Sequence, residues 1–410
     1  MSKEYNKALI PERRFPDFMT DESWKIMSFG EAFSRITTKN AENNTNVLTI
    51  SAQHGLVSQT EYFKKSVAAK DLTGYYLLQK GDFAYNKSYS KGYPMGAIKP
   101  LKLYEQGVVS TLYICFKTKN GFSSDYFEHY FESGSLNSEV SKIAQEGGRA
   151  HGLLNVSVKE FFRDVRLMVP TLPEQQKIAD CLSSIDELIE AEEQKLDELK
   201  AHKKGLMQHL FPSDGKAVPK LRFPEFHNQG EWKTKPLDQI AENLNSQRVP
   251  ITKKDRIKGS IPYYGASGVI DYVKDYIFDD ELLCISEDGA NLVARTYPIA
   301  FSIKGKAWVN NHAHVLRFEN ACTQVIVESY LNSISLEDYL TGMAQPKLNR
   351  AKLNVIPIPL PDLNEQQKVA DLLLSIDELI RPQIQKVNYL KFHRKGLIQN
   401  LFPSLEEVEK

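Results

Sequence analysis

The stretch EQQKIADCLSSIDELIEAEEQKLDELKAHKKGLMQHLFPS, residues 174–213, recurs as EQQKVADLLLSIDELIRPQIQKVNYLKFHRKGLIQNLFPS at residues 365–404. The two copies align without a gap at a constant offset of 191, and 26 of their 40 positions are identical. A shorter marker precedes each copy: RFPDF ends at Phe18, RFPEF ends at Phe226, and a Trp-Lys pair follows each at Trp24 and Trp232. The chain is therefore built from two half-molecules in tandem.

The sequence between these shared segments differs between the halves. One body lies between Trp24 and Pro170 and the other between Trp232 and Pro359, and no convincing alignment joins them. A duplicated scaffold with two different inserts suits a protein that reads two different things at a fixed separation. We divide the chain into a first domain with an N-terminal arm (1–169), a central helix (170–213), a second domain (214–359) and a C-terminal helix (360–410).

The repeated segments carry the periodicity of long helices. Their apolar residues recur at alternating steps of four and three, with polar interruptions at Glu192 and Lys203 in the first copy. Such a heptad seam is typical of a helix that packs lengthwise on a partner. The seam residues are Ile178, Leu182, Ile185, Ile189, Leu196, Leu199, Leu206 and Leu210, and in the same register Val369, Leu373, Ile376, Ile380, Val387, Leu390, Leu397 and Leu401.

A single seam would ordinarily indicate a helical-bundle edge or a dimerisation coil. Two matched seams on one chain favour antiparallel pairing with each other. At ~1.5 Å per residue, about 37 helical residues make a rod of roughly 55 Å, which exceeds the ~34 Å turn of B-DNA. Pro382 lacks a backbone donor, so we expect a kink in the second helix.

Composition and charge describe an ordinary globular chain. The 410 residues are 41% hydrophobic, and 52 basic residues balance 52 acidic ones. Zero net charge argues against a strong lone nucleic-acid binder, because phosphate neutralisation needs clustered Lys and Arg, yet the body from Trp24 to Val169 has 18 basic and 13 acidic residues. The four cysteines form no CxxC pair, and neither a signal peptide nor a membrane-spanning run is evident. We expect a soluble cytoplasmic protein with no membrane partner.

The two bodies predict α+β domains with mixed or mostly antiparallel sheets. Runs rich in β-branched and aromatic residues, such as VVSTLYICF (108–116) and YIFDDELLCIS (276–286), are bounded by Gly, Asn and Asp. Shorter helices are expected near residues 125–134 and 325–333. We expect the two domains to be arranged pseudo-symmetrically and joined by two long antiparallel coiled-coil helices.

Motifs for catalysis or metal binding do not emerge. The chain has no Pro-Pro dipeptide of the kind a methyltransferase turn requires, and no GxxxxGK[ST] loop for a motor. The Glu-x-Lys at Glu231, which a metal nuclease could use, is replaced by Ser23 in the first half. His312 and His314 share a face on a strand, but without a suitably spaced third ligand we interpret them as core or hydrogen-bonding residues. We predict no catalytic residue, no metal and no cofactor in this chain.

Loops that combine basic, amide and aromatic groups are the candidates for DNA contact. Arg can read guanine with two hydrogen bonds, whereas Lys and Ser mostly hold phosphate. The alternative for any one of them is an exposed loop side chain or, for the aromatics and above all Trp308, a packed core residue. The candidates are Lys87, Ser88, Tyr89, Lys91, Tyr93, Arg149 and His151 in the first domain, and Tyr263, Tyr264, Ser267, Lys304, Lys306, Trp308, Asn310, Asn311, Gln345 and Lys347 in the second.

With these residues in place, the chain resembles the specificity subunit of type I restriction-modification systems. The resemblance rests on the two EQQK…IDELI helices alternating with variable regions, and on phrases such as GDFAYNKSYSKGYPMGAI (81–98), IPYYGASGVIDYV (261–273) and NNHAHVLRF (310–318). It implies two target-recognition domains that each read half of a split sequence in double-stranded DNA. It also implies binding of two methyltransferase (modification) subunits and, through them, restriction (translocase) subunits. S-adenosylmethionine, ATP and magnesium are expected only in those partners.

Two other functional classes remain open from the sequence. A coiled-coil scaffold with two protein-binding globular ends would show the same helices. A self-contained nuclease or methyltransferase is disfavoured by the missing motifs.

Overall fold

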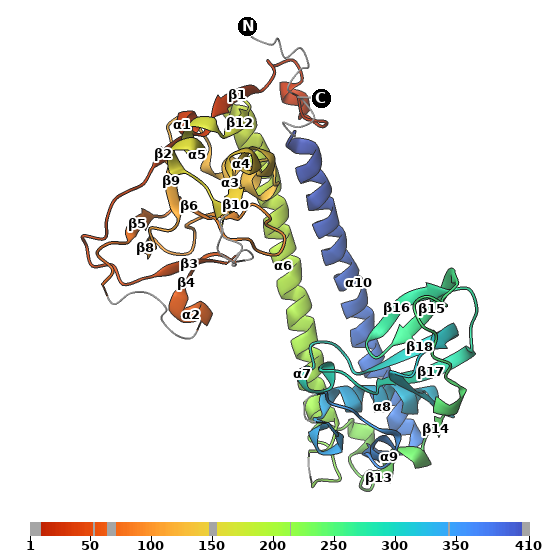
Figure 1. Cartoon of the computed structure of the whole chain (residues 1–410). Helices are drawn as coiled ribbons and strands as arrows, with labels where there is room; N and C mark the ends of the chain where they lie inside the picture. Colours follow the sequence, from red (N-terminus) through yellow and green to blue (C-terminus); the bar gives the residue numbers. More distant parts are fainter. Residues whose placement is uncertain are drawn as a thin grey trace. The chain divides into compact units, whose positions relative to one another are not determined.

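The computed structural model describes residues 10–51, 54–63, 71–146, 154–213, 215–342 and 345–403. The chain forms two compact units, the first made from two stretches of sequence and the second from one. The first unit comprises residues 1–191 and 387–410, and the second comprises residues 192–386. The long helices α6 (Leu172–Leu210) and α10 (Leu363–Leu401) each give one half to each unit (Figure 1).

The first unit is built from short strands and short helices around the N-terminal half of α6. Its four-stranded antiparallel sheet has the order β2-β9-β6-β7, and the pairs β1-β12, β3-β4, β5-β8 and β10-β11 flank it. Its elements are η1 (Pro16–Phe18), β1 (Lys25–Ser28), α1 (Phe29–Ala32), β2 (Phe33–Arg35), β3 (Leu48–Ser51), β4 (Gly55–Ser58), α2 (Gln59–Phe63), β5 (Tyr76–Gln79), β6 (Phe83–Asn86), β7 (Ala97–Pro100), β8 (Gln106–Val109), β9 (Ile114–Thr118), α3 (Ser124–Glu132), α4 (Asn137–Ile143), β10 (Gln145–Glu146), β11 (Leu154–Asn155), α5 (Val158–Asp164) and β12 (Arg166–Val169).

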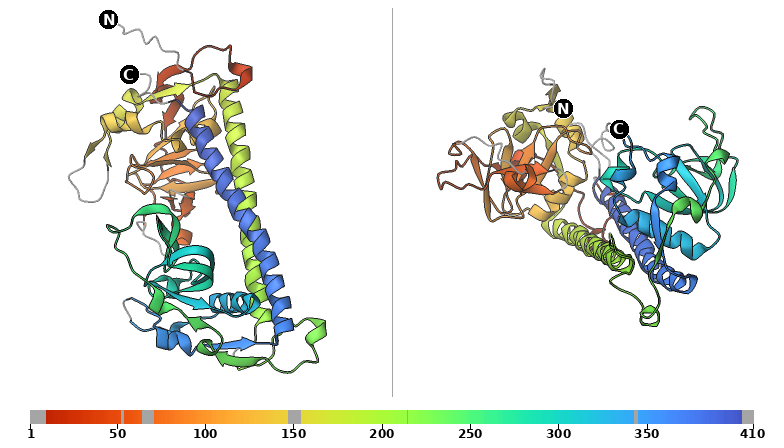
Figure 2. Two further views of the ribbon diagram at one scale, coloured as in Figure 1. Left: turned by 90° about the vertical axis from the view of Figure 1, so that its right-hand side faces the viewer. Right: turned by 90° about the horizontal axis from the view of Figure 1, so that it is seen from below.

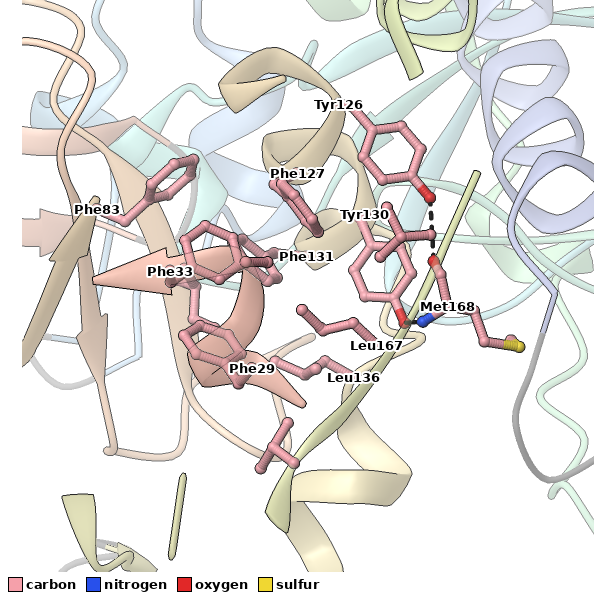
Figure 3. Packing of buried hydrophobic residues seen from close by; sticks show 14 of the residues in the cluster. Phe29, Phe33, Phe83, Tyr126, Phe127, Tyr130, Phe131, Leu136, Leu167 and Met168 are labelled. Atoms are coloured by element: carbon pink, nitrogen blue, oxygen red, sulfur yellow. Dashed lines mark hydrogen bonds between the residues drawn. The ribbon is translucent and has the colours of Figure 1, made fainter. Parts of the chain in front are cut away.

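An aromatic core joins this sheet to α3. Phe29 and Phe33 stack with ring centroids 4.5 Å apart, and Phe33 meets Phe127 of α3 at 4.6 Å (Figure 3). Two tyrosines of α3 are fully buried and reach β12: the Tyr126 hydroxyl donates to the Met168 carbonyl, and the Met168 amide donates to the Tyr130 hydroxyl (Figure 3). Aromatic pairs of this kind add to the free energy of burying their area, so α3 is firmly held.

The second unit contains a longer sheet. Its six strands have the order β14-β19-β17-β18-β15-β16; all pairs are antiparallel except β15 with β18. β13 pairs with β20 separately. The elements are η2 (Pro224–Phe226), β13 (Lys233–Pro236), η3 (Leu237–Gln239), β14 (Glu242–Asn243), η4 (Asn245–Gln247), β15 (Lys258–Gly265), β16 (Gly268–Val273), β17 (Phe278–Ser286), α7 (Asn291–Ala294), β18 (Ala300–Val309), β19 (Ala313–Arg317), α8 (Ala321–Ser333), η5 (Glu337–Tyr339), α9 (Arg350–Asn354) and β20 (Pro357–Leu360).

The second half of β17, near the middle of this sheet, is buried on both faces. In β17, Leu283 and Ile285 join the core that includes α8 and α10, whereas Leu282 and Cys284 join a separate core with Ile303. Side chains alternate between faces along a strand, so the short apolar run from Leu282 to Ile285 contributes to two cores at once.

The long helices pack antiparallel within each unit (Figure 2). In the first unit, Ile178 and Leu182 of α6 share a core with Leu401 of α10. In the second unit, Leu210 of α6 shares a core with Val369 and Leu373 of α10. Every predicted seam residue is buried or half-buried. Pro382 lies at an exposed position inside α10, which continues through it without interruption.

The prediction of α+β domains with largely antiparallel sheets and two long antiparallel helices is confirmed. Each helix has 39 residues rather than the expected 37 or so. The compact units divide the chain differently from our four segments, because the two halves of each helix pack against different domains. Within the described residues, no helix combines the length and apolar content that a membrane crossing requires.

Candidate nucleic-acid interface

The first turn of each long helix contains a buried glutamate. Glu174 at the start of α6 accepts hydrogen bonds from Arg14 Nε at 2.8 Å and Nη2 at 2.7 Å, and from Trp24 Nε1 at 3.2 Å. The side chains of Arg14 and Glu174 are only 4% and 1% exposed. A buried carboxylate is tolerated where several donors satisfy it, so this contact fixes the N-terminal arm to the first turn of α6.

The second unit repeats this contact. Glu365 at the start of α10 accepts from Arg222 at 2.8 and 2.7 Å and from Trp232 Nε1 at 3.2 Å. Arg222 opens the RFPEF marker as Arg14 opens RFPDF. The duplicated markers and the Glu of EQQK are therefore the parts of one interaction built twice.

The first glutamine of EQQK ties each helix to its domain. Gln175 Oε1 accepts from the Ser123 amide at 2.9 Å, at the start of α3. Gln366 Oε1 accepts from the Thr323 hydroxyl at 2.6 Å, in the first turn of α8. The two bodies, which do not align in sequence, thus each supply a helix at an equivalent place. Sequence reasoning missed this correspondence because the donor is a backbone amide in one unit and a side-chain hydroxyl in the other, so no shared residue marks it.

Polar contacts between α6 and α10 also occur in matched copies. Asp186 accepts from Arg394 Nη2 at 2.8 Å in the first unit, and Asp377 accepts from Lys203 at 2.6 Å in the second. These are one ion pair repeated at the offset of 191, since Asp186 corresponds to Asp377 and Lys203 to Arg394. The polar interruptions of the heptad seam therefore serve interhelical pairing.

A further polar contact lies at the middle of the two helices. Gln383 Nε2 donates to the carbonyl of Glu192 at 2.8 Å and to its carboxylate at 2.7 Å, and Lys386 pairs with the same carboxylate at 2.5 Å. Glu192 and Gln383 are themselves repeat equivalents. Hydrogen bonds from Lys386 and Gln383 hold the pKa of Glu192 below its usual value.

Five of the first-domain candidates, from Lys87 to Tyr93, lie between β6 and β7. Tyr89 is 64% exposed and Lys91 is also exposed. Lys87 is half-buried, and burial lowers the pKa of its ammonium. The Ser88 amide donates to Asn86 Oδ1 at 3.1 Å, which shapes the turn. Arg149 and His151 lie outside the described residues.

Tyr93 is engaged within the fold. Its hydroxyl donates to Glu132 Oε2 at 2.7 Å, and the Lys99 ammonium lies 5.0 Å from its ring centre. Burial, followed by the nearby Glu132 carboxylate, raises the pKa of this phenol. The Tyr93 hydroxyl thereby joins the β6–β7 segment to α3.

Several loops of the second domain meet at one end of its sheet. The Asn310 amide donates to the Tyr264 carbonyl at 3.0 Å, and Ser286 Oγ donates to the Ala266 carbonyl at 2.5 Å. The Gly289 amide donates to the Pro346 carbonyl at 3.1 Å. These bonds bring together the candidates that we name the loop cluster: Tyr264, Ser267, Asn310, Asn311, Gln345 and Lys347. Ser267, Asn311, Gln345 and Lys347 are exposed there.

Two candidates of this domain, Tyr263 and Asn310, are buried in the fold. Tyr263 is 1% exposed because its strand position points inward, and Arg256 lies 4.3 Å from its ring centre. Asn310 is 4% exposed and its Oδ1 accepts from the His312 amide at 2.8 Å, so it shapes the turn. Tyr264, half-buried, stacks near Phe301 at 6.0 Å, and burial raises the pKa of its phenol.

The remaining three candidates lie on β18. Lys304 pairs with Glu281 at 3.2 Å, and the Lys306 ammonium lies 4.7 Å from the ring centre of Tyr276. Both lysines are exposed. Trp308 is half-buried and donates its indole N–H to the Val249 carbonyl at 2.6 Å. In the described part of the chain, the contacts of these three side chains given above are with Glu281, Tyr276 and Val249, which lie outside the loop cluster.

The two histidines act as hydrogen-bonding residues. His314 is fully buried, with Nε2 2.7 Å from the Leu348 carbonyl and Nδ1 2.7 Å from Asn245 Nδ2. Burial lowers the pKa of His314. His312 Nδ1 lies 2.8 Å from Asp288 Oδ2. Among the described residues no group of three or more His, Cys, Asp or Glu could hold a metal ion.

A family model described as the type I restriction modification DNA specificity domain matches this chain twice, over residues 22–201 and 229–389. A Haemophilus influenzae protein that bears the name of a type I restriction enzyme specificity subunit is 37% identical over 149 residues, which cover 36% of this chain and 38% of that protein. The chain thus matches less than half of that relative's length. The type I restriction enzyme MjaVIII specificity subunit of Methanocaldococcus jannaschii is 24% identical over 327 residues, or 73% of this chain and 74% of that one.

The fold is also found in solved structures. The crystal structure of a type I restriction-modification S subunit from M. genitalium superimposes with a TM-score of 0.64 at 14% identity, covering 97% of this chain and all of that one. A chain from a study of assembly and conformational transition of a type I system gives a TM-score of 0.52 at 15% identity, covering 92% and 97%. At such low identity these similarities show the fold alone.

Proposed function

Because the chain belongs to the family of type I restriction-modification DNA specificity subunits, we propose that it reads a bipartite DNA target, one half with each domain. The observation that carries this proposal is that the two halves share a duplicated frame, made of the RFPDF/RFPEF markers and the long helices, but carry unlike domains between these parts. Arg14, Glu174 and Trp24 recur as Arg222, Glu365 and Trp232 with closely similar distances. The connections between the strands that this frame holds differ between the two domains, which suits two different half-sites.

The long helices would set the unread gap between the half-sites. Each has 39 residues, or roughly 58 Å at ~1.5 Å per residue, compared with ~34 Å for one turn of B-DNA. Matched ion pairs and an apolar seam stabilise their antiparallel pairing within each unit. A stiff spacer of this kind would hold the gap constant while the domains vary.

The same duplicated helices would dock two methyltransferase subunits. Two identical partners require the same side chains twice, and the IDELI motif supplies them: Leu188 is 43% exposed and its repeat equivalent Leu379 is 58% exposed. An apolar residue retained at an exposed position in both copies suits a protein contact. Restriction subunits would join through the methyltransferases, and S-adenosylmethionine, ATP and magnesium would be bound by those partners.

Exchange of one domain tests the proposal. A chain in which residues 24–169 come from a relative is assembled with the methyltransferase subunits, and its target is mapped by DNA selection and methylation sequencing. We expect one half of the target to change while the gap and the other half persist. A change in both halves would contradict the modular reading. Recovery of no bipartite motif with the unaltered chain would favour a protein-binding scaffold.

A further inference from the structure

A largely buried ion pair lies beneath the loop cluster. Arg248 Nη1 donates to Glu287 Oε2 at 2.8 Å, and the two side chains are 12% and 14% exposed. Neither residue was singled out from the sequence, because Arg248 lies in an unremarkable loop, NSQRVP, and Glu287 directly follows β17.

Arg248 holds the turn that carries Asn311. Its Nη1 also donates to the carbonyls of Ala313 at 2.7 Å and Asn311 at 3.3 Å, and its Nε donates to the Asn245 carbonyl at 3.1 Å. The planar guanidinium presents its donors in a fixed geometry, so these contacts together determine where the turn lies.

Glu287 connects that turn to the loop that carries Gln345 and Lys347. Its amide donates to the His312 carbonyl at 2.9 Å, and its carbonyl accepts from the Leu348 amide at 2.8 Å. Its Oε1 lies 3.3 Å from the Lys347 ammonium. Burial acts to raise the pKa of Glu287, but the hydrogen bond from Arg248 and the neighbouring cationic groups leave it lowered overall, so the carboxylate remains charged.

We propose that Arg248 and Glu287 are positioning residues for sequence reading by the second domain: they touch no base themselves but fix Asn311, Gln345 and Lys347 relative to one another. The proposal rests on the proposed function. Direct base reading depends on the placement of hydrogen-bonding groups, whereas binding to phosphate depends mainly on charge. Loss of the Glu287 charge should therefore lower discrimination between DNA sequences. It should not lower the affinity for DNA in general, because it also frees the positive charge of Lys347, whose side chain is 51% exposed, to attract phosphate.

The test compares Glu287→Gln, Arg248→Lys and the control Glu242→Gln in the complex with methyltransferase subunits. Glu242 accepts from Arg317 at 3.0 Å and is 61% exposed, so the control removes an ion pair of the same domain at a distance from the loop cluster. The measurement is discrimination at each half-site, from selection on duplexes randomised in one half at a time, together with affinity for random-sequence DNA.

We expect Glu287→Gln to lower discrimination at least tenfold at one half-site only, with affinity for random DNA unchanged or higher. Arg248→Lys, which keeps the charge but loses the fixed geometry of the guanidinium, should affect the same half-site to a smaller degree, and Glu242→Gln neither. Unchanged discrimination in Glu287→Gln would overturn the proposal, as would an equal loss at both half-sites with a lower melting temperature, since that marks a general folding defect. A parent complex that selects no bipartite motif would instead contradict the proposed function.

Discussion

The buried contact at the start of α6 gives the sharpest stability prediction. Glu174→Gln keeps the size of the side chain but leaves the guanidinium of Arg14, 4% exposed, without its counter-charge. Breaking a buried ion pair by removing one partner costs about 3–5 kcal/mol. Because Gln still offers one acceptor to Arg14 or Trp24, we expect the low end, about 3 kcal/mol.

This loss should be visible and local. For a unit of this size, 1 kcal/mol lowers Tm by roughly 2–4 °C, so the first unit should melt roughly 6–12 °C lower. Hydrogen exchange should locate the change at the start of α6 and in the arm. The control is Lys177→Gln in the same turn, where the pair with Asp17 at 3.5 Å is half exposed and should be worth under ~1 kcal/mol. Equal effects of Glu174→Gln and Lys177→Gln would refute the reasoning.

Three further outcomes follow from the structure. Burial lowers the pKa of His129 to about 4, below its value in the unfolded chain. The contribution of neutral His129 to folding stability is therefore complete above about pH 6.5 and is lost as the pH falls toward 4, by about 3 kcal/mol at ~1.36 kcal/mol per pH unit. The stability of His129→Gln in denaturation experiments should depend less on pH than that of the parent over this range. Neutralising Lys87 and Lys91 together should weaken DNA binding and reduce the slope of log affinity against log salt by about 2 if both contact phosphate. The control is Lys80→Gln, which removes an exposed ion pair with Glu105. An unchanged slope in the double variant would show that neither lysine lies in the DNA interface. Pro382→Ala should raise stability in thermal melts by up to ~3 kcal/mol, because proline inside a helix removes a hydrogen bond; an unchanged Tm would mean that α10 already accommodates it.

The markers and long helices could be predicted well from the sequence because each of them occurs in two copies. The offset of 191 between the repeats reappears in the contact of Glu192 with Gln383, and the heptad seams become the buried faces of α6 and α10. The seam interruption at Lys203 is explained by its ion pair with Asp377. A repeated pattern is easier to interpret from sequence because positions that agree between the two copies can be told from positions that differ.

The candidate interface was harder to predict because each of its positions occurs once. Tyr263 and Tyr264 are adjacent in an aromatic stretch, and which of them is buried depends on the phase of β15, which composition does not reveal. Asn310 and Asn311 differ in the same way, since the first shapes the turn and the second is exposed. Arg248 acts through contacts with residues more than 35 positions away, and no local motif marks it.

The most direct test of the central claim alters only the length of the helix pair. Seven residues in the same heptad register are inserted at equivalent places in both helices, after Ala191 and after Pro382, which adds roughly 10 Å to each at ~1.5 Å per residue. The target is then mapped by methylation sequencing in cells that also carry the methyltransferase subunits. We predict two unchanged half-sites separated by a gap longer by about three base pairs, given ~3.4 Å per base pair. An active complex with an unchanged gap, or with altered half-sites, would contradict this prediction.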